Sequence, residues 1–293
     1  MGILSSRTGW HVDGLRAALE ARGVAPAVFP ITALVAAVGL GEAVPVVRAE
    51  AHRLEGFSLL LVRIIPGGSL EQIVFRMNAL HRLEQLDVLV VNRPGAIERT
   101  VDKYLTSAIL EARGLPTPAT LVSETLDEAM RAFAALGRDV VVKPLFGSGG
   151  RGMVRVSDEE VAYRTFQALD LARAVFYVQR FVPHGDHDVR AFVVGGEVVA
   201  AMRRRSSGWR HNVSRGASVE AHHPSAEETR LALAAAAALD LDYAGVDLLP
   251  AADGRTYVVE VNAIPGWAGL QRTTSCSIAD AIAAYLVRRL EAA

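Results

Sequence analysis

The sequence lacks the features that mark several classes of protein. Its 293 residues include a single cysteine, Cys276, which excludes a disulfide framework and a cysteine-based zinc site. The longest purely apolar run has nine residues, Leu231 to Leu239, whereas a membrane span needs ~18. The first residues show no charged segment followed by an apolar stretch, so no secretory signal is predicted. These absences predict a reduced, cytoplasmic protein without a membrane span.

The sequence also has no excess of positive or negative charge. The chain has 31 Lys and Arg against 32 Asp and Glu, for a formal net charge of −1. No basic excess is available to neutralise phosphates, which excludes a protein that binds nucleic acid over its whole surface. The hydrophobic content of 51% excludes a disordered chain and suits roughly two domains. This apolar surplus is also compatible with a homo-oligomer.

Strand-like and helix-like patterns alternate at the start of the chain, which predicts a doubly wound parallel sheet in a domain of residues 1–94. A central lobe is predicted over 95–174 and a C-terminal lobe over 175–293, so the class is α/β with α+β character in the last two lobes. The predicted helices span 11–22, 70–85, 101–113, 126–136, 225–239 and 277–291. The predicted strands span 2–4, 27–29, 59–62, 88–91, 139–143, 153–156, 175–181, 188–194, 197–203, 244–249 and 256–262.

The most conspicuous motif is the glycine-rich loop of residues 147–152, which satisfies G-x-G-x-x-G. A dinucleotide-binding loop would open a helix, but residues 153–156 are strand-like. A protein kinase would place its lysine after the loop, whereas Lys143 precedes it. We therefore predict a β-hairpin flap whose N–H groups cradle phosphate, with Lys143 at its base. A flexible glycine hairpin without a ligand is the alternative.

Two carboxylates are brought together by a predicted turn. Asp253-Gly254 between apolar runs is a strong signal for a two-residue hairpin, which would place Asp247 opposite Glu260. Asn262 then shares the face of Glu260, because side chains alternate along a strand. The opposite face is predicted to carry Val259 and Val261. Three oxygen donors suit Mg²⁺ rather than zinc, with a positive group between the opposed acids. Solvated residues on an exposed strand face are the alternative.

Arginines gather in one segment between residues 203 and 215, which contains no acid. The guanidinium group binds carboxylate and phosphate through two parallel hydrogen bonds, so the segment favours an anionic substrate. RNA is the alternative, because Trp209 lies among these residues. Upstream, Asp188 and Arg190 add an acid and a donor of the kind that line a nucleotide pocket. The five arginines are Arg203, Arg204, Arg205, Arg210 and Arg215.

In their order and spacing, these motifs resemble the ATP-grasp superfamily and, within it, the RimK-like α-L-glutamate ligases. The resemblance covers essentially the whole chain and implies an ATP-grasp fold that follows an N-terminal parallel-sheet domain. It rests on Asp102-Lys103, Lys143-Pro144, Gly147–Gly152, Gln179-Arg180-Phe181-Val182, Asp188-Val189-Arg190, Asn212, Arg215-Gly216, Asp247 and Glu260-Val261-Asn262.

The resemblance also implies a role for each matching residue. The ATP phosphates would be held by Lys103, Lys143, Gly147, Ser148, Gly149, Gly150 and Gly152. Adenine would bind to Gln179, Arg180, Phe181 and Val182, and the nucleotide site would be completed by Asp188, Arg190 and Asn212. Two Mg²⁺ (or Mn²⁺) ions would be held by Asp247, Glu260 and Asn262. The arginines that steer the carboxylate and the transferring phosphate would be Arg204 and Arg215.

The activity implied is that of an ADP-forming acid–amino-acid ligase, in which ATP phosphorylates a carboxylate and an amine displaces the phosphate. Such ligases add L-glutamate to a protein C-terminus, an amino-group carrier or a cofactor tail. Trp10-His11 and residues 265–271 are most similar to the cofactor-tail, tetrahydromethanopterin-type ligases, and the arginines suit an acidic acceptor. A ligase for a protein C-terminus or carrier, a small-molecule kinase and a nucleotide-binding regulator without turnover are the alternatives.

Overall fold

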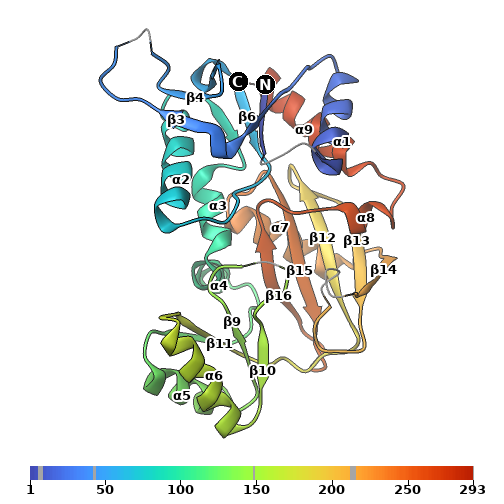
Figure 1. The fold of residues 1–293 in the computed structure, drawn as a ribbon. Helices are drawn as coiled ribbons and strands as arrows, with labels where there is room; N and C mark the ends of the chain where they lie inside the picture. The colour runs from blue at the N-terminus through green and yellow to red at the C-terminus, as the bar shows by residue number, and fades with distance from the viewer. Residues whose placement is uncertain (6–8, 42–43, 148, 212–215, 293) are drawn as a thin grey trace.

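The chain forms an N-terminal parallel sheet and two antiparallel lobes (Figure 1). The computed structural model describes residues 1–5, 9–41, 44–147, 149–211 and 216–292. In the N-terminal sheet the strand order is β2-β1-β6-β7 and every pair is parallel. Its strands are β1 (Gly2–Ser5), β2 (Ala27–Pro30), β6 (Leu59–Val62) and β7 (Leu89–Val91).

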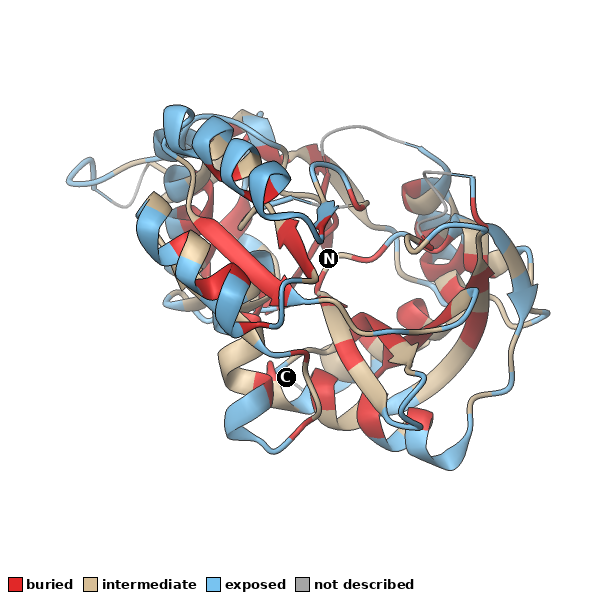
Figure 2. Cartoon of the chain, turned by 90° about the horizontal axis from the view of Figure 1, so that it is seen from below, coloured by how far each residue is buried: buried red, intermediate tan, exposed pale blue. Residues whose placement is uncertain are grey.

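Helices cover both faces of this sheet, which confirms the doubly wound prediction. One face packs Ile3 and Leu61 against α1 (Trp10–Glu20) and α9 (Ile278–Glu291). The other face packs against α2 (Leu70–Glu84). Because both faces are buried, the strands have continuous apolar sequences rather than alternating ones. The two central strands, β1 and β6, are buried throughout, and Figure 2 colours buried residues red.

A small antiparallel sheet and two short 3₁₀ helices also belong to this lobe and were not predicted. The sheet comprises β3 (Leu34–Ala36), β4 (Val47–Ala49) and β5 (His52–Arg53). The 3₁₀ helices are η1 (Ile31–Ala33) and η2 (Leu54–Gly56). Strands of two or three residues are too short for an alternating pattern to identify them.

The central lobe is a four-stranded antiparallel sheet of order β10-β9-β11-β8, with α5 and α6 packed on one face. The predicted helix 101–113 corresponds to α4, which begins after Asp102 because this side chain accepts hydrogen bonds from the N–H groups of Tyr104 and Leu105. The helix before it, α3, was not predicted. The elements are α3 (Pro94–Val101), α4 (Lys103–Ala112), β8 (Thr120–Ser123), α5 (Leu126–Ala135), β9 (Val140–Lys143), β10 (Val154–Val156), α6 (Glu159–Leu171) and β11 (Phe176–Arg180). Since β11 pairs with β8 and β9, this sheet extends past the domain limit predicted at 174.

The C-terminal lobe is a five-stranded antiparallel sheet of order β14-β13-β12-β15-β16. One face packs against α7, and part of the other packs against α9. The elements are β12 (His187–Val194), β13 (Glu197–Arg205), β14 (Ser218–Ala221), α7 (Ala226–Ala238), β15 (Tyr243–Pro250), β16 (Thr256–Asn262) and α8 (Ala268–Gln271). Among the described helices, none combines the length and the apolar character needed to cross a bilayer.

The turn between β15 and β16 differs from the prediction. The N–H of Ala251 donates to the carbonyl of Arg255 at 2.8 Å, so three residues, not two, separate the last paired positions. A three-residue loop shifts the pairing by one position relative to the two-residue turn expected at Asp253-Gly254. The prediction of a two-residue turn is therefore wrong.

A β-bulge in β16 compensates for the longer loop. Leu248 pairs with Val258, but Asp247 pairs with Glu260, so Val259 is an additional residue on β16. The bulge restores the predicted opposition of the two carboxylates. It also turns Val259 toward the cavity that Glu260 lines, so the prediction that residue 259 faces away from Glu260 is wrong.

Asn92, directly after β7, joins the N-terminal lobe to the C-terminal sheet. Its Nδ2 donates to the carbonyls of Tyr243 at 2.8 Å and Ala263 at 2.6 Å. Its Oδ1 accepts from the N–H groups of Asp242 at 2.7 Å and Tyr243 at 3.3 Å. The side chain is fully buried, so no water replaces these bonds when the amide is removed.

We expect Asn92→Ala to lower the free energy of unfolding by about 3 kcal/mol, because buried backbone groups lose their partners. Asn78→Ala, on the exposed side of α2, is the matched control and should change it by less than about 0.5 kcal/mol. Urea unfolding measures both. Equal effects of the two substitutions would contradict this role of Asn92.

Candidate functional site

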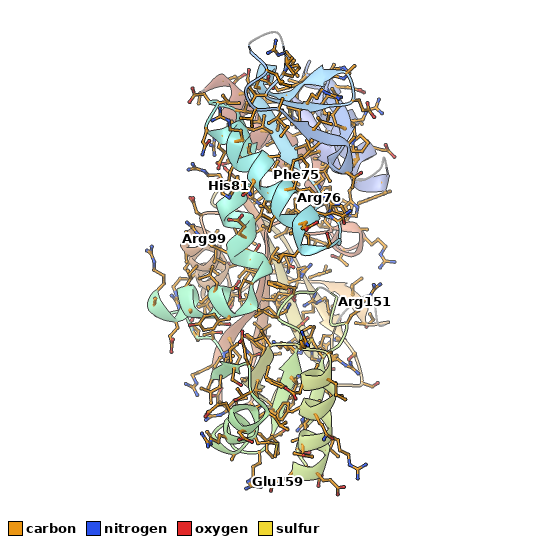
Figure 3. All side chains as sticks on the ribbon, turned by 60° about the vertical axis from the view of Figure 1, so that its left-hand side comes forward. Phe75, Arg76, His81, Arg99, Arg151 and Glu159 are labelled. Carbon is orange, nitrogen blue, oxygen red and sulfur yellow. The ribbon has the colours of Figure 1, made fainter. Side chains whose placement is uncertain are left out.

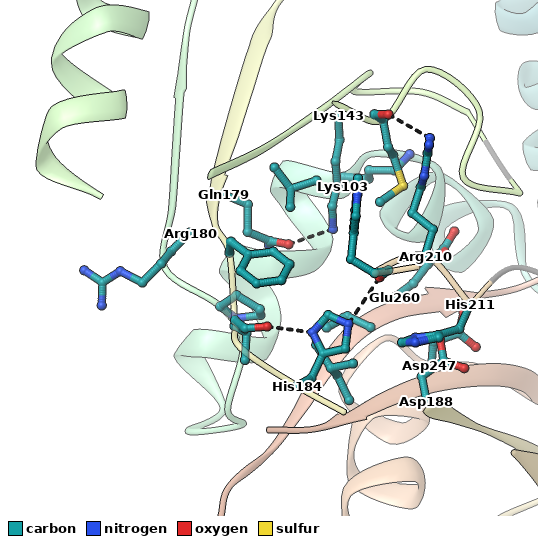
Figure 4. Close-up of a pocket in the computed structure, with 18 of the residues that line it drawn as sticks. Lys103, Lys143, Gln179, Arg180, His184, Asp188, Arg210, His211, Asp247 and Glu260 are labelled. Carbon is teal, nitrogen blue, oxygen red and sulfur yellow. Dashed lines mark hydrogen bonds and ion pairs between the residues drawn. The ribbon is translucent and has the colours of Figure 1, made fainter. Parts of the chain in front are cut away.

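The candidate site is a cavity between the central sheet and the C-terminal sheet (Figure 4). The central sheet turns Val141, Lys143 and Gln179 toward it, because their neighbours in sequence pack under α5 and α6. Ten of the predicted site residues line this cavity: Lys103, Lys143, Gln179, Arg180, Phe181, Val182, Asp188, Arg204, Asp247 and Glu260. The predicted residues Ser148, Asn212 and Arg215 lie outside the described residues.

Two lysines supply positive charge on the central-lobe side. The Nζ of Lys143 donates to Oε1 of Gln179 at 2.7 Å, and the Nζ of Lys103 donates to the carbonyl of Gly147 at 2.9 Å. Burial lowers the pKa of Lys143 to about 8, although the Glu260 carboxylate acts in the opposite direction. Burial also lowers the pKa of Lys103. An anion bound here would raise the pKa of both amines again and so stabilise their charged forms.

The glycine loop joins β9 to β10, which are antiparallel, so the predicted hairpin is confirmed and no helix follows the loop directly. Gly149, Gly150 and Gly152 have φ of 67°, 67° and 74°, the left-handed region that glycine adopts without strain. In the view of Figure 3, Arg151 of the loop lies below Arg76 of α2 and above Glu159 of α6. Arg210 of the C-terminal lobe donates to the carbonyl of Met153 at 3.1 Å, which holds the end of the loop over the cavity.

The segment predicted to bind adenine follows β11 along the cavity wall. The Nε2 of Gln179 donates to Oγ1 of Thr120 at 2.9 Å, so this amide is fixed by its own lobe. The ring of Phe181 is covered by the Arg155 guanidinium, whose carbon lies 3.5 Å from the ring centre. Figure 4 shows the side chain of Arg180 directed away from the cavity, where its Nε donates to the carbonyl of Leu136 at 3.3 Å. Arg180 therefore lines the cavity with its backbone, and its guanidinium charge lies outside the cavity.

Four charged residues form a buried cluster on the C-terminal sheet. Asp247 accepts from Nε of Arg190 at 2.6 Å and from Nη2 of Arg190 at 2.9 Å. Arg204 makes two hydrogen bonds of 2.7 Å to Asp188 and also lies 2.9 Å from Asp247. Burial raises the pKa of Asp188 to about 6. Burial also disfavours ionisation of Asp247, but its two arginines outweigh this and hold its pKa below the usual range.

The three predicted metal ligands are not equivalent in the structure. Asp247 is engaged by two guanidinium groups, and the described ranges contain no group of three His, Cys, Asp or Glu side chains arranged to hold a metal. Glu260, in contrast, makes no hydrogen bond or ion pair to another described residue. The Nδ2 atom of Asn262 is buried and has no hydrogen-bond partner among the described residues. The carboxylate of Glu260 fits a hard cation such as Mg²⁺, and the amide oxygen of Asn262 is a ligand of the same chemical kind. Asp247 is already held by Arg190 and Arg204, so one guanidinium would have to leave before it could bind a cation.

The arginine segment does not form one surface. Arg204 faces the cavity, whereas its neighbour Arg205 pairs with Asp186 and Glu220 at the exposed edge. The structure also adds His184 and His211 to the cavity wall, and no sequence pattern pointed to His184. Burial lowers the pKa of His211 to about 4, so its imidazole is neutral at pH 7.

Known proteins are similar to this chain along most of its length. The sequence model described as the RimK-like ATP-grasp domain matches residues 100–286. The tetrahydromethanopterin:alpha-L-glutamate ligase of Methanocaldococcus jannaschii is 40% identical over 221 residues, covering 73% of this chain and 75% of that protein. The ligase of the same name from Methanococcus maripaludis is 33% identical over 288 residues, covering 96% and 95%.

Among solved structures, the ATP-grasp ligase PsnB complexed with minimal precursor, Mg and ADP has a TM-score of 0.76. Its sequence identity is 21%, and the match covers 99% of this chain and 98% of that one. The two chains share the ATP-grasp fold.

The pKa of Lys143 leads to a prediction about pH. The affinity for ATP should fall about tenfold as the pH rises from 7 to 9.5, because the free amine loses its charge above pH 8. Lys143→Arg is the control, since a guanidinium stays charged over this range. Calorimetric titration of ATP at each pH measures both proteins. Parallel pH profiles for the two would contradict the assignment.

Arg204 should be needed for stability, because removing it leaves Asp188 and Asp247 as buried acids with one guanidinium between them. Arg204→Met should lower the free energy of unfolding by about 3–5 kcal/mol. Arg205→Met removes the neighbouring, exposed arginine and should cost less than about 1 kcal/mol. Denaturant unfolding compares them, and an Arg204→Met protein as stable as Arg205→Met would refute a structural role for the cluster.

Proposed function

The chain belongs to the RimK-like ATP-grasp family of ATP-dependent ligases, and from this premise we propose that it joins an amine to a carboxylate by way of an acylphosphate, with L-glutamate as the amine substrate. An acidic cofactor tail of the tetrahydromethanopterin type is the proposed acceptor, because two relatives that cover most of the chain carry that name. One structural observation carries the proposal: Lys103, Lys143 and Glu260 line the same cavity beside the glycine loop, and the Glu260 carboxylate has no hydrogen-bond or ion-pair partner among the described residues.

The proposed chemistry needs positioned charge more than a covalent group. A carboxylate does not react with an amine, so one of its oxygens first attacks the γ-phosphorus of ATP and ADP leaves. The amine nitrogen then attacks the acyl carbon, phosphate leaves with the C–O bond electrons, and the nitrogen loses a proton. Lys103 and Lys143 bind the phosphates and offset the charge that develops on them. The glycine loop above them excludes water, which would otherwise hydrolyse the acylphosphate.

Glu260 and Asn262 are the residues that would hold Mg²⁺, and we propose two such ions (or Mn²⁺) with Asp247 as a third ligand. When bound, the metal neutralises phosphate charge. Arg204 is fixed by two acids, so we propose that it positions Asp188 and Asp247 instead of steering the substrate as predicted. The steering role predicted for Arg215 and the nucleotide contacts predicted for Asp188, Arg190 and Asn212 remain proposals.

Glu260→Gln should reduce glutamate-dependent ADP release by at least about 100-fold, since a charged ligand is lost where charge develops. Glu197→Gln, an exposed acid at the start of β13, is the matched control and should retain full activity. The assay contains ATP, Mg²⁺, L-glutamate and a cell extract as the source of acceptor. Mass spectrometry of the product should show increments of one glutamate residue. ADP release without glutamate, together with a phosphorylated product, would contradict the ligase and indicate a kinase.

A further inference from the structure

The carboxyl edge of the N-terminal sheet contains a topological switch point between β1 and β6 that lies outside the proposed ATP site. β1 and β6 are neighbours, and the chain leaves them in opposite directions, through α1 to β2 and through α2 to β7. Ligands of open α/β sheets bind at the carboxyl ends of strands at such a switch point. Arg63 follows β6 directly, and its N–H donates to the carbonyl of Leu4 on β1 at 2.8 Å.

Arg63 is a buried cation whose partners are all neutral. Its Nη1 donates to the hydroxyl of Tyr243 at 2.9 Å and its Nη2 to the carbonyl of Pro265 at 3.0 Å. The guanidinium carbon lies 4.6 Å from the ring centre of Trp267. The residue is 8% exposed, and its Nε has no hydrogen-bond partner among the residues that the structure describes. Guanidinium groups have five N–H bonds, and two are used here. Buried charges are normally paired, and none of the described carboxylates pairs with this one.

The other groups at this position leave the positive charge of Arg63 unopposed. Nε2 of His11, at the start of α1, accepts from the N–H of Trp267 at 3.0 Å. That bond places the imidazole proton on Nδ1 and keeps the ring neutral. Burial and the charge of Arg63 lower the pKa of His11 to about 4, in agreement with that form. Trp10 lies beside Trp267, with ring centres 6.4 Å apart, and is 55% exposed. Asp13 and Asp280 line the hollow that Trp10 and Trp267 share, but Asp280 pairs with Arg22, and neither acid forms an ion pair with Arg63 among the described residues.

Arg63 lies in line with the proposed nucleotide site. Tyr243, Gly245, Asp247 and Leu249 alternate along β15 and so share one face of the sheet. Leu249 and Asp247 line the ATP cavity, whereas Tyr243 contacts Arg63. Tyr243 and Asp247 are four residues apart, about 13 Å along the strand. A Cβ on Gly245 would meet Pro265 at 2.9 Å, so the glycine lets the loop that carries Pro265 lie against the strand between the two sites.

We propose that Arg63 is the subsite for a carboxylate of the acidic substrate that does not itself react. The inference rests on the proposed function, because a glutamate that is added and an acidic acceptor tail each bring such a carboxylate. Trp267 and Tyr243 orient the guanidinium. A two-point hydrogen bond to the carboxylate would use the second N–H of Nη1 and of Nη2, which no described residue accepts, because Nε is fully buried. The position beyond the phosphate end of the cavity suits a group that stays attached while the neighbouring carboxylate reacts.

The test measures binding without turnover. Glutarate, a dicarboxylate without an amine, is titrated calorimetrically into the full-length protein. Arg63→Met should weaken glutarate binding at least tenfold and change the affinity for ATP less than twofold. Arg82→Met is the matched control, because it makes the same substitution at an exposed arginine of α2, and should change glutarate affinity less than twofold. If the Arg63→Met protein does not fold, Arg63→Lys takes its place. Lysine keeps the charge but lacks the planar pair of donors, so the affinity for glutarate should fall at least threefold.

Two further titrations identify the source of the carboxylate. If Arg63→Met weakens the binding of L-glutamate, the subsite belongs to the amine substrate. If it weakens only the binding of α-linked diglutamate, the subsite belongs to the acceptor tail. Either result supports the site. Wild-type protein that binds no glutarate, or a folded Arg63→Met protein that binds it as tightly as wild type, overturns it. Loss of the proposed ligase function would appear separately, as ADP release that does not depend on glutamate.

Discussion

The pairing of Asp188, Arg190, Arg204 and Asp247 is the constraint on which the rest of the site depends. These side chains come from β12, β13 and β15, and their ion pairs fix those strands relative to one another on the face opposite α7. Two acids and two bases make the cluster neutral, which is what allows charges to be buried there. With Asp247 engaged, the negative charge that remains for a ligand is concentrated on Glu260.

The cavity draws its opposite charges from different lobes. The central lobe contributes Lys103 and Lys143, and the C-terminal sheet contributes Glu260. The ionisation of each amine depends on how far the two sheets enclose it, since burial lowers the pKa values of both lysines. Anion binding and closure of the cavity therefore reinforce each other, because a bound phosphate stabilises the charge that burial would otherwise remove.

Local patterns predicted the elements well and the side-chain partners poorly. The hairpin nature of the glycine loop followed from the strand-like residues after it. The opposition of Asp247 and Glu260 was predicted from a two-residue turn, and it holds only because the bulge at Val259 offsets the three-residue loop. The arginine partners of Asp247 could not be predicted, because Arg190 and Arg204 come from two other strands whose order in the sheet is set by long-range packing. The start of α4 had a local signal, the capping aspartate Asp102, which lies one residue from the predicted start at residue 101.

The β-bulge at Val259 changes the phase of side-chain alternation along β16. In a regular strand, consecutive residues point to opposite faces, so at most every second residue can line a cavity. The phase change lets Val259 and Glu260 line the same wall, one apolar and one charged. An apolar wall next to a carboxylate lowers the local dielectric and so strengthens the attraction of that carboxylate for a cation. Grafting this hairpin onto another sheet would therefore require transferring its irregularity as well as its acidic residues.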